Sequence, residues 1–266
     1  MSHLKAEEDE CFILVKALPH LSSNYAETVC CAGIGHDAKW RRLYPVQFRI
    51  LDDNQKFKRW QWISYRYTTS KKDPRKESQK VVPESIHTGK LLGQSERIAI
   101  LNSIMRKTLD EADTRTESLV LLRPQSIEFG WIAKTKAQIE DERQKHAALA
   151  NQLSLLDAVK APPLTPCPYQ FSVKWTDQNK TKHTHVCDDW ETSTAFFVRR
   201  KSQSNDESAL SSLKQTYEQS YMNSGMAMAF STHSRRNVTH GMENQWLLVG
   251  LIRIDESKQG DLLAQL

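Results

Sequence analysis

Short β-rich runs separated by turn residues fill the beginning of this 266-residue chain and constrain its fold more than any other feature. CFILVKAL (11–18), ETVCCAGIG (27–35) and KWRRLYP (39–45) are rich in strand-forming residues, and a Gly-His-Asp turn separates the last two. FKRWQWISYRY (57–67) alternates aromatic with polar residues, which is also typical of a strand. These runs predict a hairpin that feeds a sheet.

Helical patterns follow further along the chain. A serine before a helical periodicity predicts a helix over 95–112, and a highly charged segment predicts a long helix over 135–159. Two apolar runs, 118–124 and 126–134, predict two more strands of the same sheet. The lysine-rich segment 71–80 surrounds a proline and is expected to form a loop.

Four prolines within residues 161–169 predict a hinge between two lobes. Beyond it, the sequence predicts two strands, two helices and two strands, at 169–175, 184–187, 189–200, 207–221, 226–233 and 245–255. We therefore predict an α+β fold of two mixed sheet-and-helix lobes, residues 1–160 and 161–266, joined by the Pro-rich hinge.

Charge and cysteine usage limit the class of protein. A formal net charge of +5 and a pI of about 8.9 suit a polyanionic partner without requiring one. The five cysteines show no CxxC spacing and no signal peptide precedes them, so reduced thiols in a cytoplasmic protein are expected. No apolar stretch is long enough to span a membrane. Without a GxSxG, Walker or GxGxxG motif, serine hydrolases, phosphate-loop NTPases and dinucleotide enzymes are disfavoured, and no cofactor is expected.

The segment KHTHVCDDWE (182–191) concentrates ionisable groups around one tryptophan. Because side chains alternate along a strand, two histidines and a thiol would share one face, namely His183, His185 and Cys187. Asp189 and Glu191 would then lie in the first turn of a helix, where negative charge is favoured. These carboxylates are candidate catalytic groups. The alternative is that Asp188 or Asp189 caps the helix and Trp190 anchors it in the core.

A metal site is a further possibility for this segment. His183, His185 and Cys187, together with His233 and His240, could supply soft ligands for zinc. Their spacing matches no recognised finger pattern, so the sequence favours partly buried histidines and no metal is assigned.

Glu27 begins the second strand beside Tyr25, just before a buried apolar run. A carboxylate in such a place can be desolvated, which raises its pKa and suits general acid/base catalysis. The alternative is a strand-end glutamate exposed to solvent.

Basic residues interleaved with aromatic residues predict contacts with nucleic acid. Guanidinium groups bind phosphates and aromatic rings stack on unpaired bases, and residues 40–44 offer both. On a strand, only one of the two arginines there can face each side. A packing stripe on the sheet is the alternative. With two further basic segments, the candidate DNA contacts are Arg41, Arg42, Lys71, Lys72, Arg75, Arg235 and Arg236.

The chain resembles a family of bacterial proteins of about this size along nearly its whole length. The shared motifs fall on Glu27 to Cys30, Trp40 to Pro45, Pro74 to Ser78, His183, Asp189 to Glu191, Ser231 to Thr232, and Trp246. Relatives often carry cysteines before the Gly-His motif, whereas this chain has Lys182, which weakens the zinc hypothesis. The chain is also similar to phage-defence DNA glycosylases that remove glucosylated hydroxymethylcytosine.

This resemblance implies antiviral hydrolysis of an N-glycosidic bond in double-stranded phage DNA with modified bases, after the target nucleotide has been flipped out. Glu27 is then the first candidate for the catalytic carboxylate, followed by Asp189 and Glu191. Candidate pocket residues are Tyr25, Tyr44, Trp190, His183 and His233. Two alternatives remain: a non-catalytic reader of modified nucleic acid, and a metal-dependent nuclease built on Glu27, Glu77, Asp189 and Glu191.

Overall fold

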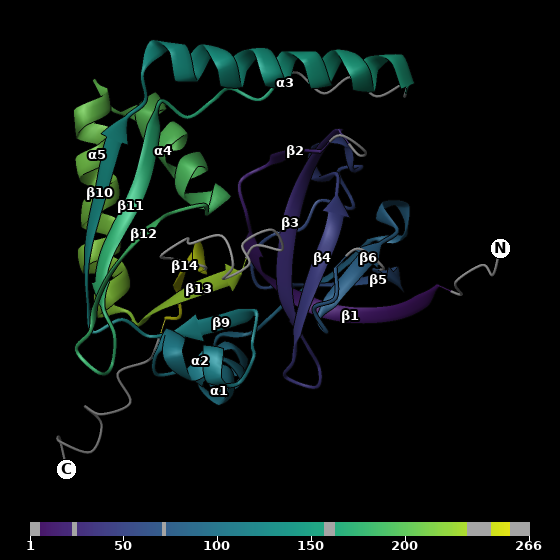
Figure 1. Cartoon of the computed structure of the whole chain (residues 1–266), viewed down its shortest axis with the longest axis horizontal. Helices are drawn as coiled ribbons and strands as arrows, with labels where there is room; N and C mark the ends of the chain where they lie inside the picture. Colours follow the sequence, from purple (N-terminus) through teal and green to yellow (C-terminus); the bar gives the residue numbers. More distant parts are fainter. Residues whose placement is uncertain (1–5, 23–25, 71–72, 157–162, 233–245, 256–266) are drawn as a thin grey trace.

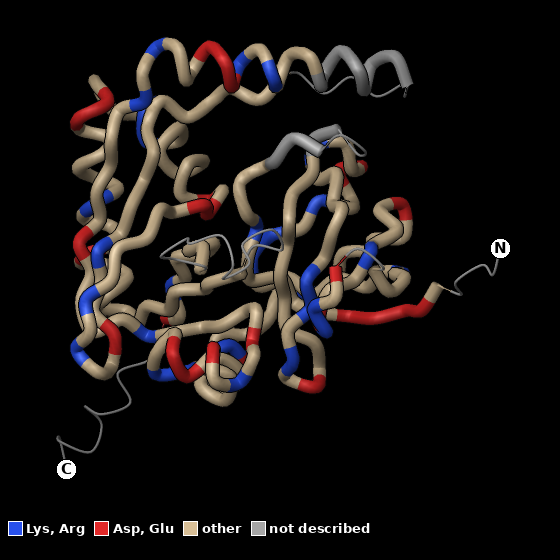
Figure 2. The backbone as a smooth tube through the Cα atoms, in the orientation of Figure 1, with Lys and Arg blue, Asp and Glu red and all other residues tan. Residues whose placement is uncertain are grey.

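The computed structural model describes residues 6–22, 26–70, 73–156, 163–232 and 246–255 (Figure 1). It is an α+β structure with several sheets, as the sequence predicts. Blue stretches of Lys and Arg and red stretches of Asp and Glu are scattered along a backbone that consists mostly of other residues, and the start of the first strand is acidic (Figure 2). In the described part, no helix combines the length and apolar character needed to cross a membrane.

The first part of the chain forms a closed ring of strands. Its members are β1 (Glu7–Lys16), β3 (Ala26–Gly35), β4 (Trp40–Val46), β5 (Gln61–Thr69) and β6 (Ser78–Val81). Because β1 pairs with both β3 and β5, the sheet closes into a barrel. The short strands β2 (His20–Ser22) and β7 (His87–Leu91) extend it, and the 3-10 turns η1 (Phe48–Ile50) and η2 (Pro83–Ser85) lie in its connections.

The connectivity of this barrel is that of the OB fold. Around the ring, the strands follow one another as β1, β3, β4, β6, β5 and back to β1. The pairing of β4 with β6 is parallel and the other four are antiparallel. OB folds bind oligonucleotides on their second and third strands and on the loops after the first and fourth strands. Here these are β3, β4, the β1–β3 connection and the β5–β6 connection.

The side chains of β3 divide between two cores. Val29 and Cys31 point into the barrel, where they pack with residues such as Phe57 and Ile63. The alternate residues Ala32 and Ile34 point outward and pack against the second part of the chain. The outward side of β3 is therefore partly a contact surface between the two parts.

The barrel packs on a four-stranded sheet in the order β14-β13-β9-β8. Its strands are β8 (Met105–Arg106), β9 (Leu119–Leu122), β13 (Met226–Thr232) and β14 (Trp246–Arg253). The helices α1 (Gln94–Ile104) and α2 (Leu109–Thr114) lie next to it in the chain, and both contact β9.

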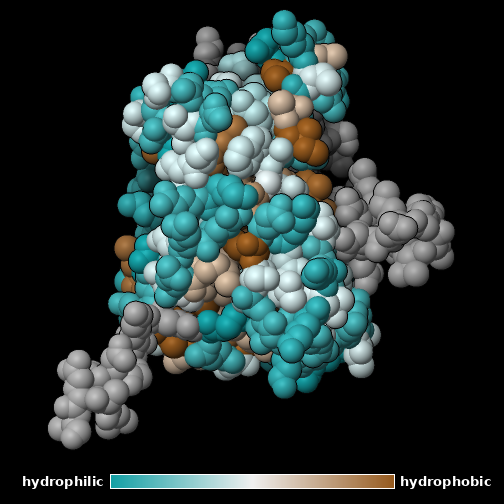
Figure 3. Space-filling view, turned by 90° about the vertical axis from the view of Figure 1, so that its left-hand side faces the viewer, coloured by the Kyte–Doolittle hydropathy of each residue, from teal (hydrophilic) through white to brown (hydrophobic). Residues whose placement is uncertain are grey.

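A third sheet lies on the other side of the molecule (Figure 1). It contains β10 (Ser126–Ala133), β11 (Tyr169–Thr176) and β12 (Lys182–Val186), and it packs with α4 (Trp190–Ser202), α5 (Asp206–Gln215) and the π-helical turn η3 (Thr216–Tyr221). The side of the molecule that carries β10 and α5 is mostly hydrophilic, with apolar residues scattered over it (Figure 3).

The long helix α3 (Lys136–Leu156) follows β10 and contacts β2 and β3 of the barrel. It runs across one end of the molecule from the third sheet to the barrel (Figure 1). The two parts of the chain are therefore connected by this helix as well as by the packed sheets.

Strand pairing places the boundary between the two parts earlier than the expected residue 160. β9 pairs with β13, and β10 pairs with β11, so both belong with the C-terminal strands. The two strands expected in one sheet therefore lie in two different sheets. The helix expected over 95–112 ends at Ile104, and α2 is separate. Apolar periodicity predicts that a strand forms but does not specify its distant partner, which explains these differences.

Candidate nucleic-acid interface

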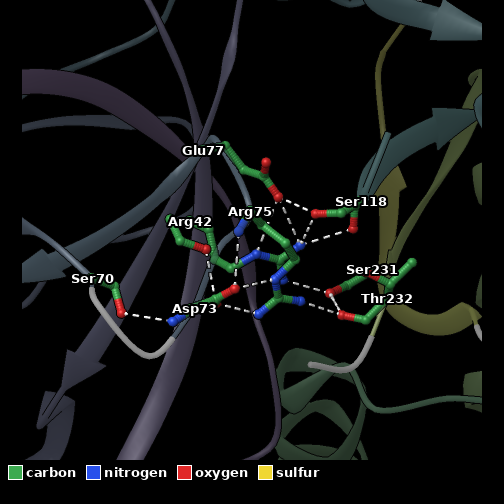
Figure 4. A network of polar contacts seen from close by, with 9 residues as sticks. Arg42, Ser70, Asp73, Arg75, Glu77, Ser118, Ser231 and Thr232 are labelled. Atoms are coloured by element: carbon green, nitrogen blue, oxygen red, sulfur yellow. Dashed lines mark hydrogen bonds and ion pairs between the residues drawn. The ribbon is translucent and has the colours of Figure 1, made fainter. Parts of the chain in front are cut away.

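Arg42 joins the barrel to the second part of the chain (Figure 4). Its side chain leaves β4 on the outward face, and the residue is only 7% exposed. One terminal nitrogen donates to Ser231 Oγ at 2.6 Å, and the other donates to the carbonyl oxygen of Ser118 at 2.8 Å and contacts Glu77 Oε1 at 3.1 Å. Ser118 Oγ also donates to Glu77. Burial lowers the pKa of Arg42, and the charge of Arg75 lowers it further.

Arg75 makes a second link between the same two parts. Its guanidinium binds both carboxylate oxygens of Asp73, at 2.7 and 2.5 Å, and donates to the carbonyl oxygen of Thr232 at 2.5 Å. Ser78 Oγ donates to the same carboxylate at 2.8 Å. Burial alone would raise the pKa of Asp73, but the hydrogen bonds from Arg75 and Ser78 outweigh it and the pKa is lowered.

Two basic segments of the sequence are attached to this network. Ser70 and Asp73 flank Lys71 and Lys72, and the Asp73 backbone N–H donates to Ser70 Oγ at 3.2 Å. Thr232 directly precedes a segment of the sequence that contains two histidines and two arginines. The expected site residues Lys71, Lys72, His233, Arg235, Arg236 and Tyr25 lie outside the described residues. The network therefore brings Asp73 and Thr232, the described residues next to these two segments, close together although they are far apart in the sequence.

The structure corrects the assignment of Arg42 to a phosphate. Its Nε and both terminal nitrogens already contact Glu77, Ser118 or Ser231, and the residue is buried. Because these contacts cross from the barrel to β9 and β13, Arg42 holds the two parts together. Arg75 has the same kind of internal partners, although its side chain is 18% exposed.

We expect Arg42→Met to lower the free energy of unfolding by about 3 kcal/mol, since it leaves Glu77 and two hydroxyls without their cation. Urea unfolding followed by circular dichroism measures this loss. Arg66→Met is the control, because Arg66 lies on β5 of the same barrel and is exposed. Equal stability of the two variants would show that Arg42 does not hold the barrel and the second part together. Arg42 would then again be a candidate for a phosphate contact.

Arg41 faces the opposite side of β4, which confirms that the adjacent arginines of this strand diverge. Arg41 Nε donates to Asp9 Oδ2 at 2.6 Å, and a terminal nitrogen lies 3.2 Å from Asp37 Oδ1. Burial alone would lower the pKa of Arg41, but Asp9 and Asp37 raise it. The Arg41 side chain thus has two carboxylate partners outside the Arg42 network, which does not support its assignment to a phosphate.

Asp189 is the N-cap of α4 and the centre of a buried ion pair. Its carboxylate accepts from the backbone N–H of Glu191 at 3.0 Å and of Leu251 at 2.9 Å. Arg59 lies 3.2 Å from the same group, which is 1% exposed. Burial raises the pKa of Asp189, and the charge of Arg59 opposes this shift. Asp189 is therefore a structural group rather than a catalytic acid or base.

Glu191 and Trp190 complete this contact. Glu191 pairs with Arg59 at 3.1 Å and with Lys16 at 3.3 Å. Trp190 packs edge-on against Phe48 of η1, with ring centroids 5.7 Å apart. Since Arg59, Lys16 and Phe48 all belong to the first part of the chain, the Asp-Trp-Glu motif docks α4 on the barrel. The assignments of Glu191 to catalysis and of Trp190 to a substrate pocket are corrected accordingly.

The histidines of β12 belong to an aromatic cluster. His183 stacks on Trp175 and its Nε2 lies 3.0 Å from Asp177 Oδ2. Trp175 Nε1 donates to His185 Nδ1 at 3.0 Å, and Cys187 is buried on the same side. Burial raises the pKa of the Cys187 thiol, which opposes metal binding. In the part of the chain that the structure describes, no group of three His, Cys, Asp or Glu residues could hold a metal ion.

Glu27 and Tyr44 lie on the neighbouring strands β3 and β4. Glu27 lies at the head of β3, where its backbone pairs with Leu21 of β2, and its side chain is outside what the structure describes. Tyr44 lies on β4 two residues after Arg42, so the two share the outward side. His183 lies in the aromatic cluster, away from this face.

Arg59, Ser118 and Ser231 make contacts that the sequence does not predict, although Ser231 falls within a shared motif. Arg59 falls in the run expected to be a strand, but β5 begins only at Gln61, and Trp60 has a positive φ of 69°. The irregular backbone before β5 lets Arg59 reach Asp189 and the carbonyl oxygen of Leu251, the latter at 2.6 Å. An arginine next to a tryptophan carries no signal of such a partner.

Two family models together cover nearly the whole chain. One domain of unknown function (DUF8758) matches residues 7–107, which include the barrel, and a second (DUF8757) matches residues 102–265. The chain belongs to the DUF8757 family. The DUF8757 match begins at the end of α1, so it contains the second and third sheets. No curated protein matches the chain.

Proposed function

We propose that the protein binds DNA where the barrel meets the DUF8757 region and excises a modified base from it. The observation that carries this proposal is the OB connectivity of the barrel. The strands and connections with which OB folds bind nucleic acid contain Glu27, Tyr44 and the 71–75 segment in this chain. Because a fold alone does not fix a function, the proposal also depends on the charges at this junction.

The charge pattern supports a polyanionic partner. In the network, the carboxylates of Asp73 and Glu77 compensate the guanidinium groups of Arg75 and Arg42. The sequence next to the network adds further cations, namely Lys71, Lys72, Arg235 and Arg236. We assign the contacts with DNA phosphates to these four residues.

The proposed reaction is hydrolysis of the N-glycosidic bond of a flipped nucleotide, as an antiviral activity in the cytoplasm. A carboxylate has to stabilise the positive charge on the sugar or activate water. Asp189 and Glu191 are held in ion pairs, so we assign this role to Glu27. Glucosylated hydroxymethylcytosine in double-stranded phage DNA is the proposed substrate, on the basis of the resemblance.

Base release from two matched duplexes tests the proposal. One duplex carries ordinary cytosine and the other carries glucosylated hydroxymethylcytosine, and an aldehyde-reactive probe detects abasic sites in the presence of a chelator. Abasic sites in the modified duplex alone are the expected result. DNA cleavage that disappears with chelator would instead indicate a metal-dependent nuclease.

A second candidate is a reader that binds modified DNA without cutting it. Two described carboxylates at the junction, Asp73 and Glu77, are held in ion pairs with Arg75 and Arg42. A carboxylate held in an ion pair is poorly suited to catalysis, which favours a reader. Binding of the modified duplex without any abasic sites would select the reader.

A further inference from the structure

The second part of the chain covers only some of the barrel's outward face. Across β3, β4 and β6, the register of the sheet places Ala32, Arg42 and Ser78 in one row. These residues are 3%, 7% and 8% exposed, and Ala32 packs in a cluster with Leu121 and Ala229 of the second part. Along this row, the strands that OB folds use for nucleic acid are therefore closed to a ligand.

The next row along the same strands is open. Tyr44 lies on β4 two residues after Arg42, Lys80 on β6 pairs with Tyr44, and Thr68 on β5 pairs with Lys80. We call these three residues the open row, because Lys80 is exposed and the other two are half-buried. The covered area of the barrel thus ends between Arg42 and Tyr44.

Side-chain alternation directs the open row away from the barrel core. Leu43, Tyr67 and Val81 are the chain neighbours of its members, and they pack in or against that core. Because successive side chains of a strand point to opposite faces, the members of the open row point outward. They present a phenol, an ammonium group and a hydroxyl, each of which can donate a hydrogen bond.

The open row is suited to a phosphate group. Lys80 is its charged member, and lysine, tyrosine and threonine side chains all serve as phosphate contacts. The carboxylates of the adjacent network, Asp73 and Glu77, are paired with Arg75 and Arg42. An anion beside Lys80 is therefore not opposed by these two carboxylates.

We propose that the DNA backbone crosses the barrel along the open row, with one phosphate at Lys80 and the hydroxyls of Tyr44 and Thr68 on the oxygens beside it. This inference rests on the proposed function, since it assumes that the ligand is DNA. Neighbouring strands are about 5 Å apart, so a row across three strands spans about 10 Å, the axial length of about three base pairs.

This path connects the elements that the proposed function requires. Thr68 and Lys80 lie on the two strands that the β5–β6 connection joins, and OB folds bind nucleic acid with the corresponding connection. At the other end of the row, β4 pairs with β3, which carries Glu27. A DNA strand on the open row therefore lies beside β3 without entering the closed row.

The experiment compares wild type with Lys80→Gln, Lys80→Arg and Lys182→Gln in the full chain. Lys182 is the matched control, because it is an exposed lysine on β12 of the third sheet. Fluorescence anisotropy measures the affinity for the glucosylated and the ordinary cytosine duplex between about 50 and 200 mM salt.

We expect Lys80→Gln to weaken binding about fivefold to tenfold at about 0.1 M salt and to reduce the salt slope by about 1. A phosphate contact does not read the base, so both duplexes should be weakened by the same factor. Lys80→Arg and Lys182→Gln should keep the affinity and the slope. The melting temperature of Lys80→Gln should equal that of wild type, since the side chain is exposed.

Three outcomes would overturn the inference. If wild type binds DNA and Lys80→Gln keeps its affinity and salt slope, only the path along the open row fails. An equal loss in Lys182→Gln would show an effect of net charge rather than a contact at Lys80. If wild type binds neither duplex at any of these salt concentrations, the proposed function itself fails, and the path fails with it.

Discussion

Arg59→Leu is expected to lower the free energy of unfolding by about 3–5 kcal/mol, because it leaves a buried carboxylate without its cation. Asp189 is 1% exposed and Arg59 is its charged partner at 3.2 Å. The carboxylates of Asp189 and Glu191 also raise the pKa of Arg59, although burial alone would lower it. The variant additionally removes the donor that reaches the Leu251 carbonyl oxygen.

Equilibrium unfolding in urea measures this loss, with the double variant Arg59→Leu/Asp189→Leu as the matched control. Removing both charges is less harmful than removing one, so the double variant should recover part of the lost stability. If Arg59→Leu is as stable as wild type, α4 is not docked on the barrel through this pair. Such a result would reopen a catalytic role for Asp189.

Glu27→Gln is expected to slow base release by about a hundredfold to ten-thousandfold, the range that a general acid or base contributes. The substitution preserves the shape of the side chain and removes its charge, so binding of the modified duplex should change little. Single-turnover rates of abasic site formation and anisotropy measurements of affinity separate the two effects.

Glu191→Gln is the matched control for this prediction. Glu191 is held by Lys16 and Arg59, so its loss should affect stability while the rate of base release stays within a few-fold of wild type. Normal excision by Glu27→Gln would remove Glu27 from the reaction. A larger decrease in the rate of base release in Glu191→Gln than in Glu27→Gln would place the catalytic site at the start of α4.

Local patterns determined much of the secondary structure. The turn between the two runs at 27–35 and 39–45 corresponds to the antiparallel pairing of β3 with β4. Two short acidic side chains before a helical pattern predict an N-cap at Asp188 or Asp189, and in the structure Asp189 is the cap. The alternation along 183–187 correctly placed His185 and Cys187 on one buried face. Each of these features depends on neighbours within a few residues.

Other features depend on contacts between distant segments. The closure of the barrel requires β1 to pair with β5, and the boundary between the two parts follows from the pairing of β9 with β13. The sequence predicts that Arg41, Arg42 and Arg75 are important, but it does not predict their partners. Arg42 contacts Ser231, which lies 189 residues away, and no sequence pattern encodes that approach.

The sequence by itself thus determined the strands, the helices and the residue types suited to bind a polyanion, because periodicity and capping act over short range. Only the tertiary structure decided which of these charged groups are available. The residue type of a carboxylate or guanidinium does not reveal whether it faces solvent or a buried partner. Its desolvation and its ion pairs arise only when distant segments pack together. For this reason Asp189, Glu191 and Arg42 are structural groups in the folded protein, whereas Glu27 remains the carboxylate to test.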